Sequence, residues 1–177
     1  MKRTLLVIAV AVGALSAAGI AWSAGALGSG PAQIRVYGGG QVTVPAPNPN
    51  RTFSLTASAN PQSLEAYGSF RYAGTPPGVR GDVTCLSVAG NTALVGGFIR
   101  EGPPNLVGLD FLYAVTDNGP PASGADQAGF ADVGPELDNP PYPGLPENFP
   151  RTCPTAAGAQ ENFGAFPLTG DVSIEMP

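Results

Sequence analysis

The segment that decides the fold class, residues 79–99, reads VRGDVTCLSVAGNTALVGGFI. Its first part alternates between apolar and polar residues, with one face formed by Val79, Gly81, Val83 and Cys85. A second alternating row follows, formed by Ala93, Val95, Gly97 and Ile99. Gly90 and Asn91 lie between the two rows, and both residue types tolerate the positive φ of a tight turn. A period of two on both sides of such a turn predicts an antiparallel β-hairpin.

The apolar positions change phase within the first of these strands. After Cys85 they continue at Leu86 and Val88, so the alternation slips by one residue. Such a slip predicts a β-bulge, or a strand end that is covered on both faces.

Other segments of the chain carry the same period of two. They are residues 34–37, 42–44, 52–57, 66–72, 107–116 and 168–176, and Gly38-Gly39-Gly40 is expected to break the first from the second. No convincing helical pattern follows residue 26. The chain is therefore predicted to be all-β, a small antiparallel β-barrel of about eight strands, with a β-sandwich as the alternative. Gly68, Gly81 and Gly97 fall inside strands, where they favour the sharp bends of a small barrel.

The N-terminus predicts export. Met1-Lys2-Arg3 is followed by an uncharged stretch from Thr4 to Ala21 and then by small residues, which is the pattern of a secretory signal peptide. We expect cleavage near Ala26, so that residues 1–26 are the signal and 27–177 form a single extracellular domain with no membrane attachment. The alternative, an uncleaved anchor, is less favoured because the apolar run is short and rich in Ala and Gly.

The two cysteines, Cys85 and Cys153, both lie in the exported part and are expected to form a disulfide. They are not spaced as a C-x-x-C motif, and the chain has no His to share a metal. The bond would tie a long, acidic, Pro-rich loop, residues 118–167, to the strand that contains Cys85. Aromatic residues of this loop, including Phe149 and Phe163, could pack it onto the barrel.

The composition argues against most catalytic chemistry. The chain contains no His, and residues 27–177 contain no Lys, so His-based triads and Schiff-base catalysis are excluded. With six Arg against thirteen acids this part has a formal charge of −7, which disfavours nucleic acid as a partner. We therefore predict no enzyme activity, no cofactor and a monomer.

Two groups of side chains are candidates for ligand binding, one for calcium and one for sugars. Loop carboxylates could hold calcium, but their spacing fits no known loop motif, so we expect solvated acids; they are Asp117-Asn118, Asp126, Asp132, Glu136 and Asp138-Asn139. Tyrosines could stack on sugars, but an aromatic row in a barrel belongs more often to the core; these are Tyr67, Tyr72, Tyr113 and Tyr142.

The segment Gly81–Gly97 also carries a resemblance. Together with Gly38-Gly39-Gly40 before it and Val115-Thr116-Asp117-Asn118-Gly119 after it, the segment resembles a family of small secreted bacterial β-rich domains. Such domains occur alone or after choice-of-anchor domains. The resemblance implies a secreted β module with no assigned activity, and it identifies no catalytic residue in this chain.

These observations lead to one expected function and two alternatives. We expect a secreted, non-enzymatic binding or structural module whose partner is an unidentified extracellular or cell-surface molecule. One alternative is a lipocalin-like carrier, which requires an apolar cavity of several hundred Å³. The other is a hydrolase that uses two facing carboxylates.

Overall fold

The computed structural model divides the chain into two units, Met1–Gly30 and Pro31–Pro177. It describes residues 33–43, 50–61, 65–74, 78–120, 124–129, 132–133 and 149–177. The predicted signal peptide, residues 1–26, lies outside the described residues, as do residues 134–148 of the long loop. Among the described residues, no helix has the length and apolar character needed to cross a bilayer.

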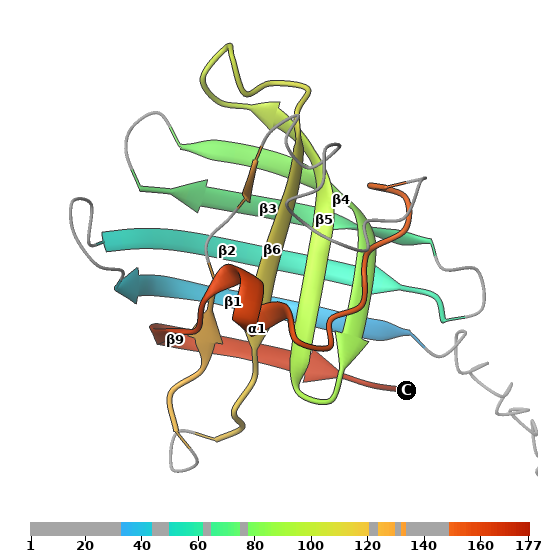
Figure 1. The fold of residues 1–177 in the computed structure, drawn as a ribbon, viewed down its shortest axis with the longest axis vertical. Helices are drawn as coiled ribbons and strands as arrows, with labels where there is room; N and C mark the ends of the chain where they lie inside the picture. Colours follow the sequence, from blue (N-terminus) through green and yellow to red (C-terminus); the bar gives the residue numbers. More distant parts are fainter. Residues whose placement is uncertain are drawn as a thin grey trace, which may run out of the picture. The chain divides into compact units, whose positions relative to one another are not determined.

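The second unit is a closed, eight-stranded antiparallel β-barrel (Figure 1). Its strands are β1 (Ile34–Thr43), β2 (Asn50–Ala59), β3 (Ala66–Ala73), β4 (Val79–Ala89), β5 (Thr92–Glu101), β6 (Asp110–Thr116), β7 (Gln127–Ala128) and β9 (Phe166–Glu175). They pair in the order β5-β4-β3-β2-β1-β9-β7-β6, and pairing of β6 with β5 closes the ring. A short strand, β8 (Asp132–Val133), pairs with β6 beside β7. The predicted barrel is therefore confirmed.

The β4–β5 hairpin confirms the turn and the bulge predicted from residues 79–99. The strands pair out to Ala89 and Thr92 around the turn, and the register shifts between Val83 and Cys85. This bulge corrects one expectation. Cys85 does not share the inward face of Val83; its Sγ would be the nearest neighbour of a Cβ at Gly96, on the outer side of β5.

The sequence predicted a break in the strand at Gly38-Gly39-Gly40, and this prediction is wrong. Strand β1 runs through them without interruption and pairs with both β2 and β9. Gly40 lies opposite Gly170, both have positive φ, and a Cβ on either would collide with the backbone of the other strand. The glycines thus allow two backbones to approach closely, which is why a strand can tolerate them.

Two other elements differ from the sequence prediction. Strand β6 begins at Asp110 rather than at Val107, which is exposed in the preceding turn. The loop 118–167 was predicted to have no regular elements, but it contains the barrel strand β7, the short strand β8 and a short helix, α1 (Ala159–Phe163). Five residues are too few for a helical period to be recognised in a sequence.

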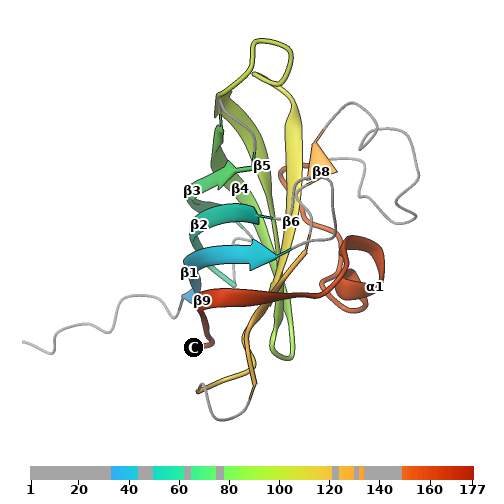
Figure 2. The same cartoon turned by 90° about the vertical axis from the view of Figure 1, so that its left-hand side faces the viewer.

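The barrel encloses one core and carries a second, smaller one outside, on the side where Figure 2 shows α1 next to the barrel. The inner core contains Val36, Val42, Phe53, Leu55, Ala57, Phe70, Val83, Ala93, Val95, Ile99, Phe111, Tyr113, Val115, Ala128, Leu168 and Val172. The outer core joins β5 and β6 to the segment that contains α1, through Leu94, Leu112, Ala114, Ala156, Ala159 and Phe163. Strands β5 and β6 are consequently buried on both faces.

The predicted disulfide is present. Cys85 and Cys153 are bonded, with their Cα atoms 5.2 Å apart. The bond holds the segment 149–163 against the outer face of β4 and β5, where Phe149 and Phe163 pack as expected. The Thr84 hydroxyl donates to the carbonyl oxygen of Pro150 at 2.7 Å, so both residues at the bulge contact this segment.

Candidate functional site

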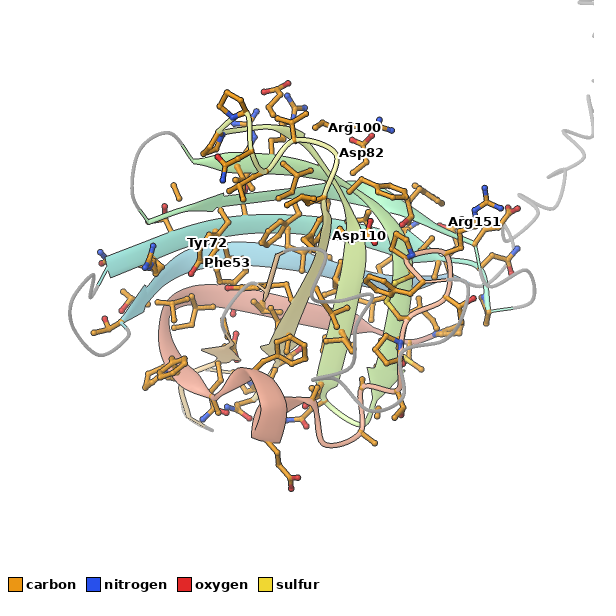
Figure 3. The ribbon with its side chains drawn as sticks, turned by 45° about the horizontal axis from the view of Figure 1, so that its top comes forward. Phe53, Tyr72, Asp82, Arg100, Asp110 and Arg151 are labelled. Carbon is orange, nitrogen blue, oxygen red and sulfur yellow. A yellow bond between two sulfur atoms is a disulfide. The ribbon has the colours of Figure 1, made fainter. Side chains whose placement is uncertain are left out.

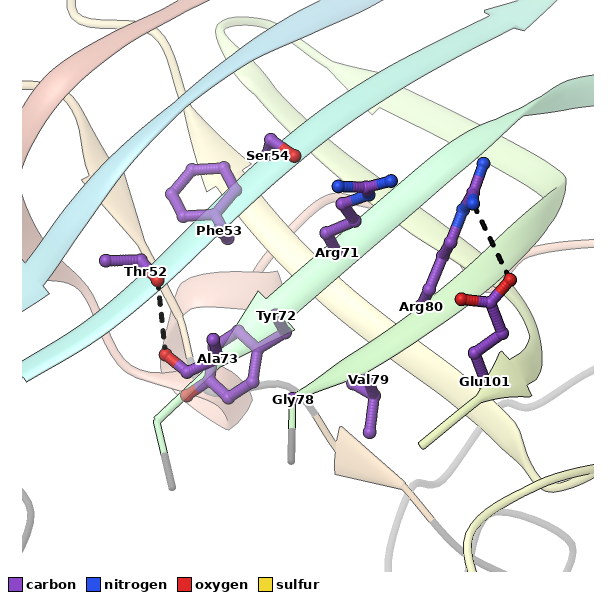
Figure 4. Close-up of a pocket in the computed structure, with 10 residues that line it drawn as sticks. All are labelled: Thr52, Phe53, Ser54, Arg71, Tyr72, Ala73, Gly78, Val79, Arg80 and Glu101. Atoms are coloured by element: carbon purple, nitrogen blue, oxygen red, sulfur yellow. Dashed lines mark hydrogen bonds and ion pairs between the residues drawn. The ribbon is translucent and has the colours of Figure 1, made fainter. Parts of the chain in front are cut away.

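A pocket of about 430 Å³ opens at one end of strands β2 to β5 (Figure 4). Its lining is formed by Thr52, Phe53, Ser54, Arg71, Tyr72, Ala73, Gly78, Val79, Arg80 and Glu101. Strand alternation shows which side of the barrel wall the pocket occupies. Phe53, Tyr72 and Val79 belong to the inward rows, whereas the side chains of the other lining residues are exposed or point outward. The pocket is therefore an open depression on the outer surface of the barrel.

Two arginines dominate the pocket. Arg71 on β3 lies directly opposite Arg80 on β4, and Figure 4 shows the two side chains extended beside each other. Arg80 forms an exposed ion pair with Glu101 at 3.6 Å. Within the described residues, Arg71 has neither an ion pair nor a hydrogen bond. Like charges that face each other across two strands repel, so this pair lowers stability unless an anion lies between the guanidinium groups.

The same wall of the barrel concentrates positive charge. Each of the four strands β2 to β5 carries one arginine, namely Arg51, Arg71, Arg80 and Arg100. Asp82 and Glu101 are the acids on these strands; Asp82 accepts from Nε of Arg100 at 2.7 Å (Figure 3). Arg51 belongs to the inward row of Phe53 and its Nε is buried, so the outer surface around the pocket carries three arginines against two acids.

An aromatic cluster fills the barrel interior behind the pocket. The ring of Tyr113 lies 5.0 Å from Phe53, 4.9 Å from Phe70 and 5.9 Å from Tyr72, measured between centroids. Burial raises the pKa of Tyr72, although the nearby charge of Arg51 partly opposes this effect. Burial also raises the pKa of Tyr113 well above its ordinary value. Two buried polar atoms here, Nε of Arg51 and the Tyr113 hydroxyl oxygen, have no hydrogen-bond partner in the described structure.

We predict that Tyr113→Phe stabilises the protein. A buried hydroxyl without a partner costs about 1 kcal/mol or more, and phenylalanine keeps the ring while removing that cost. Denaturant unfolding at pH 7 should show a higher free energy of unfolding for the variant. A loss of more than about 1 kcal/mol would instead mean that the hydroxyl has a partner. Tyr37→Phe, which removes an exposed hydroxyl together with its hydrogen bond to Glu175, serves as the comparison and should change the free energy of unfolding by no more than about 0.5 kcal/mol.

The effect of Tyr113→Phe on the free energy of unfolding should also depend on pH. The unfolded chain ionises its tyrosines near their ordinary pKa of 10.0, whereas folded Tyr113 keeps its proton to higher pH. Above pH 10 the unfolded state therefore binds fewer protons than the folded state, and stability falls as pH rises. Tyr113→Phe should make this alkaline decrease shallower.

The loop acids were expected to be solvated rather than to bind calcium, and for Asp126 this expectation is wrong. Asp126 is buried, and its carboxylate accepts the backbone N–H groups of Asn118 at 2.9 Å and Val172 at 2.7 Å. Asp117 accepts those of Gly119 at 2.7 Å and Ile174 at 3.0 Å. In the described part of the chain no cluster of three or more potential metal ligands occurs. The side chain of Asp132 and the residues Glu136 and Asp138-Asn139 lie outside the described residues.

The tyrosines divide into two groups. Tyr113 and Tyr72 belong to the interior, as expected for a barrel, and Tyr142 lies outside the described residues. Tyr67 is instead exposed on the outer surface of β3, with 56% of its area accessible. Tyr37 on β1 is also exposed, and sequence reasoning had missed it. The signal was available, since Tyr37 alternates with the inward residue Val36.

Comparisons with known protein families, with characterised proteins and with solved structures find no match for this chain.

Proposed function

We propose that residues 27–177 form a secreted, non-enzymatic binding module that holds an anionic group in the Arg71–Arg80 pocket. The observation that carries the proposal is the cross-strand arginine pair, in which only Arg80 has a carboxylate partner within the described residues. A guanidinium group donates to carboxylate, phosphate or sulfate oxygens in a fixed planar geometry. An anion bound between the two groups would relieve their repulsion and gain charge-assisted hydrogen bonds.

Extracellular location has independent support. The predicted signal peptide, the disulfide and the resemblance of the segment Gly81–Gly97 to small secreted bacterial domains all agree with export.

The arrangement of the other groups favours this function over the two alternatives. The inward rows pack against one another in a single core, and the 430 Å³ pocket lies outside it, which disfavours a lipocalin-like carrier. Four of the acids in the described part of the chain are engaged in other interactions, which disfavours a hydrolase: Asp82 and Glu101 pair with arginines, while Asp117 and Asp126 accept backbone N–H groups.

The test is an NMR titration of the ¹⁵N-labelled protein with inorganic phosphate and, separately, with galacturonate. Amide signals of β3 and β4 near the pocket should shift in the wild-type protein. Arg71→Ala combined with Arg80→Ala should weaken binding about tenfold or more, because both charge-assisted contacts are lost. Raising the ionic strength from about 0.02 M to 0.15 M should also weaken binding, because the groups are exposed.

Arg151→Ala provides the matched control. Arg151 is equally exposed, and it lies on the segment 149–158 rather than on the wall around the pocket (Figure 3). Its loss removes one positive charge, half the change in the double variant, and should leave binding unchanged. If the wild-type protein shows no saturable shifts with either anion, or if Arg151→Ala weakens binding as much as the double variant, the proposal is wrong.

A further inference from the structure

The pocket continues along the barrel surface into a strip that carries two exposed tyrosines. Ser54, in the pocket, is followed on the outer row of β2 by Thr56 and Ser58, while Arg71 is followed on the outer row of β3 by Ser69 and Tyr67. These two rows are adjacent, with Ser58 opposite Tyr67. We propose that this strip and the pocket together bind a linear acidic polysaccharide, with a negatively charged sugar in the pocket and neighbouring sugars over the tyrosines. This inference rests on the proposed function and names its ligand class.

The tyrosine hydroxyls show how the rings lie. The Tyr67 hydroxyl donates to Oε1 of Gln33 at 3.3 Å, and Gln33 precedes β1, two strands away from β3. Neighbouring strands are about 4.8 Å apart, so the side chain of Tyr67 must extend sideways across β2 rather than project into solvent. The Tyr37 hydroxyl likewise donates to Oε1 of Glu175 on β9, at 2.8 Å. The Tyr67 ring is thus held along the barrel surface over β2, whereas the Tyr37 side chain reaches toward β9 at the border of the strip.

The floor between the two tyrosines is small and polar. Thr56 lies opposite Tyr37 on one side and opposite Ser69 on the other, and the Thr56 and Ser69 hydroxyls are 3.1 Å apart. Short hydroxyl side chains leave room above the sheet, and they both donate and accept hydrogen bonds, as sugar hydroxyls do. Flat apolar ring faces next to such groups match a sugar ring, which has an apolar face and a polar edge.

The distribution of charge indicates an acidic polymer rather than a neutral one. Arg35 lies in the same cross-strand row as Ser58 and Tyr67, at the opposite end of the strip from Arg71. Arg71 and Tyr67 are four residues apart on β3, a distance of about 13 Å. Arginines therefore occur at both ends of the strip, with tyrosines and hydroxyls between them, and Glu175 on β9 lies opposite Arg35 on its other side. A polysaccharide is favoured over nucleic acid because the small hydroxyl side chains of the floor match sugar hydroxyls.

The experiment compares three ligands by isothermal titration calorimetry: galacturonate, oligogalacturonate, and neutral cello-oligosaccharide of the same length. The wild-type protein should bind the acidic oligomer more tightly than the monomer, and the neutral oligomer more weakly than the acidic one. Tyr67→Ala should weaken oligomer binding about fivefold to tenfold, while the affinity for the monomer stays within about twofold. Tyr67→Phe keeps the ring and should retain oligomer binding.

A second pair of variants tests the floor without removing an aromatic ring. Ser58→Glu places a negative charge beneath the ligand and should weaken binding of the acidic oligomer more than Ser58→Gln, which has the same shape. Thermal unfolding of each variant shows whether the fold is kept.

The possible outcomes separate this inference from the proposed function. If galacturonate binds but neither Tyr67→Ala nor Ser58→Glu affects the oligomer, the polysaccharide strip is wrong and the anion pocket stands. Tighter binding of single-stranded DNA than of oligogalacturonate would also overturn the strip. If the monomer and the oligomer both fail to bind while inorganic phosphate still binds, the strip is wrong and the anion pocket stands; if phosphate also fails, both proposals are wrong.

Discussion

Replacing Cys85 and Cys153 together by serine should lower the free energy of unfolding by about 4 kcal/mol. The two cysteines are 68 positions apart, and closing a loop of that length removes about this much entropy from the unfolded chain in the chain-entropy description. A stabilisation of this size is a large part of the total for a domain of about 150 residues. We therefore expect a substantial unfolded fraction at 37 °C.

The loss should also be visible locally, because the bond holds a second core in place. Leu94 and Leu112 on the barrel wall are covered by Ala156, Ala159 and Phe163 of the tethered segment. Without the bond, this segment remains attached by weaker contacts, such as the hydrogen bond from Thr84 to Pro150. Amide hydrogen exchange in residues 149–163 should consequently accelerate more than exchange in β1 and β2.

Denaturant unfolding of the oxidised protein, the reduced protein and the double serine variant measures this effect. The reduced protein and the variant should have the same midpoint, below that of the oxidised protein. Single serine variants are poor controls because each leaves a free, reactive thiol. If the reduced and oxidised proteins unfold at the same midpoint, the bond does not stabilise the fold.

The predictability of the barrel from sequence has a simple physical origin. Strand β2 has one face in the core and one in solvent, so the alternation at Phe53, Leu55 and Ala57 is visible in the residues themselves. The slip after Cys85 was visible for the same reason. The structural consequence of this slip could not be predicted. A change of phase does not reveal that the bulge turns Cys85 outward, toward a segment 68 residues away.

The segments that sequence reasoning misjudged are those whose conformation depends on distant partners. Gly38-Gly39-Gly40 looks like a break, yet it forms a strand because the backbones of β2 and β9 approach it closely on either side. The pocket was missed because its arginines are nine positions apart in sequence and meet only when β3 pairs with β4. The register between two strands determines which residues face each other, and it cannot be predicted from the sequence of either strand alone.

Asp126→Ala should destabilise the protein by about 3 to 5 kcal/mol, although the residue lies far from the pocket. Its carboxylate accepts the N–H groups of Asn118 and Val172, and a hydrogen bond to a charged group contributes about 1.5 to 3 kcal/mol. Alanine would leave two donors without acceptors, one of them the buried N–H of Val172. Denaturant unfolding of the variant measures the loss.

The position of Asp126 explains why the effect should be so large. The ladder between β7 and β9 comprises only two residue pairs within the described part of the chain, at Gln127–Pro167 and Ala128–Phe166. Further along β9, the N–H groups of Val172 and Ile174 are bound by the carboxylates of Asp126 and Asp117 instead of by a strand. These side chains therefore complete the closure of the barrel where its backbone pairing ends.

Matched variants distinguish this closing role from a general effect of charge. Asp171 is an exposed acid on β9, so Asp171→Ala removes the same charge as Asp126→Ala without removing an acceptor for a buried N–H group. Asp126→Asn keeps one oxygen acceptor but directs an amide N–H₂ toward the second donor, and its effect should fall between those of the two alanine variants. If Asp126→Ala costs no more than Asp171→Ala, another group must satisfy the edge of β9. Asp126 matters for closure because an N–H group on an unpaired strand edge needs an acceptor wherever water is excluded.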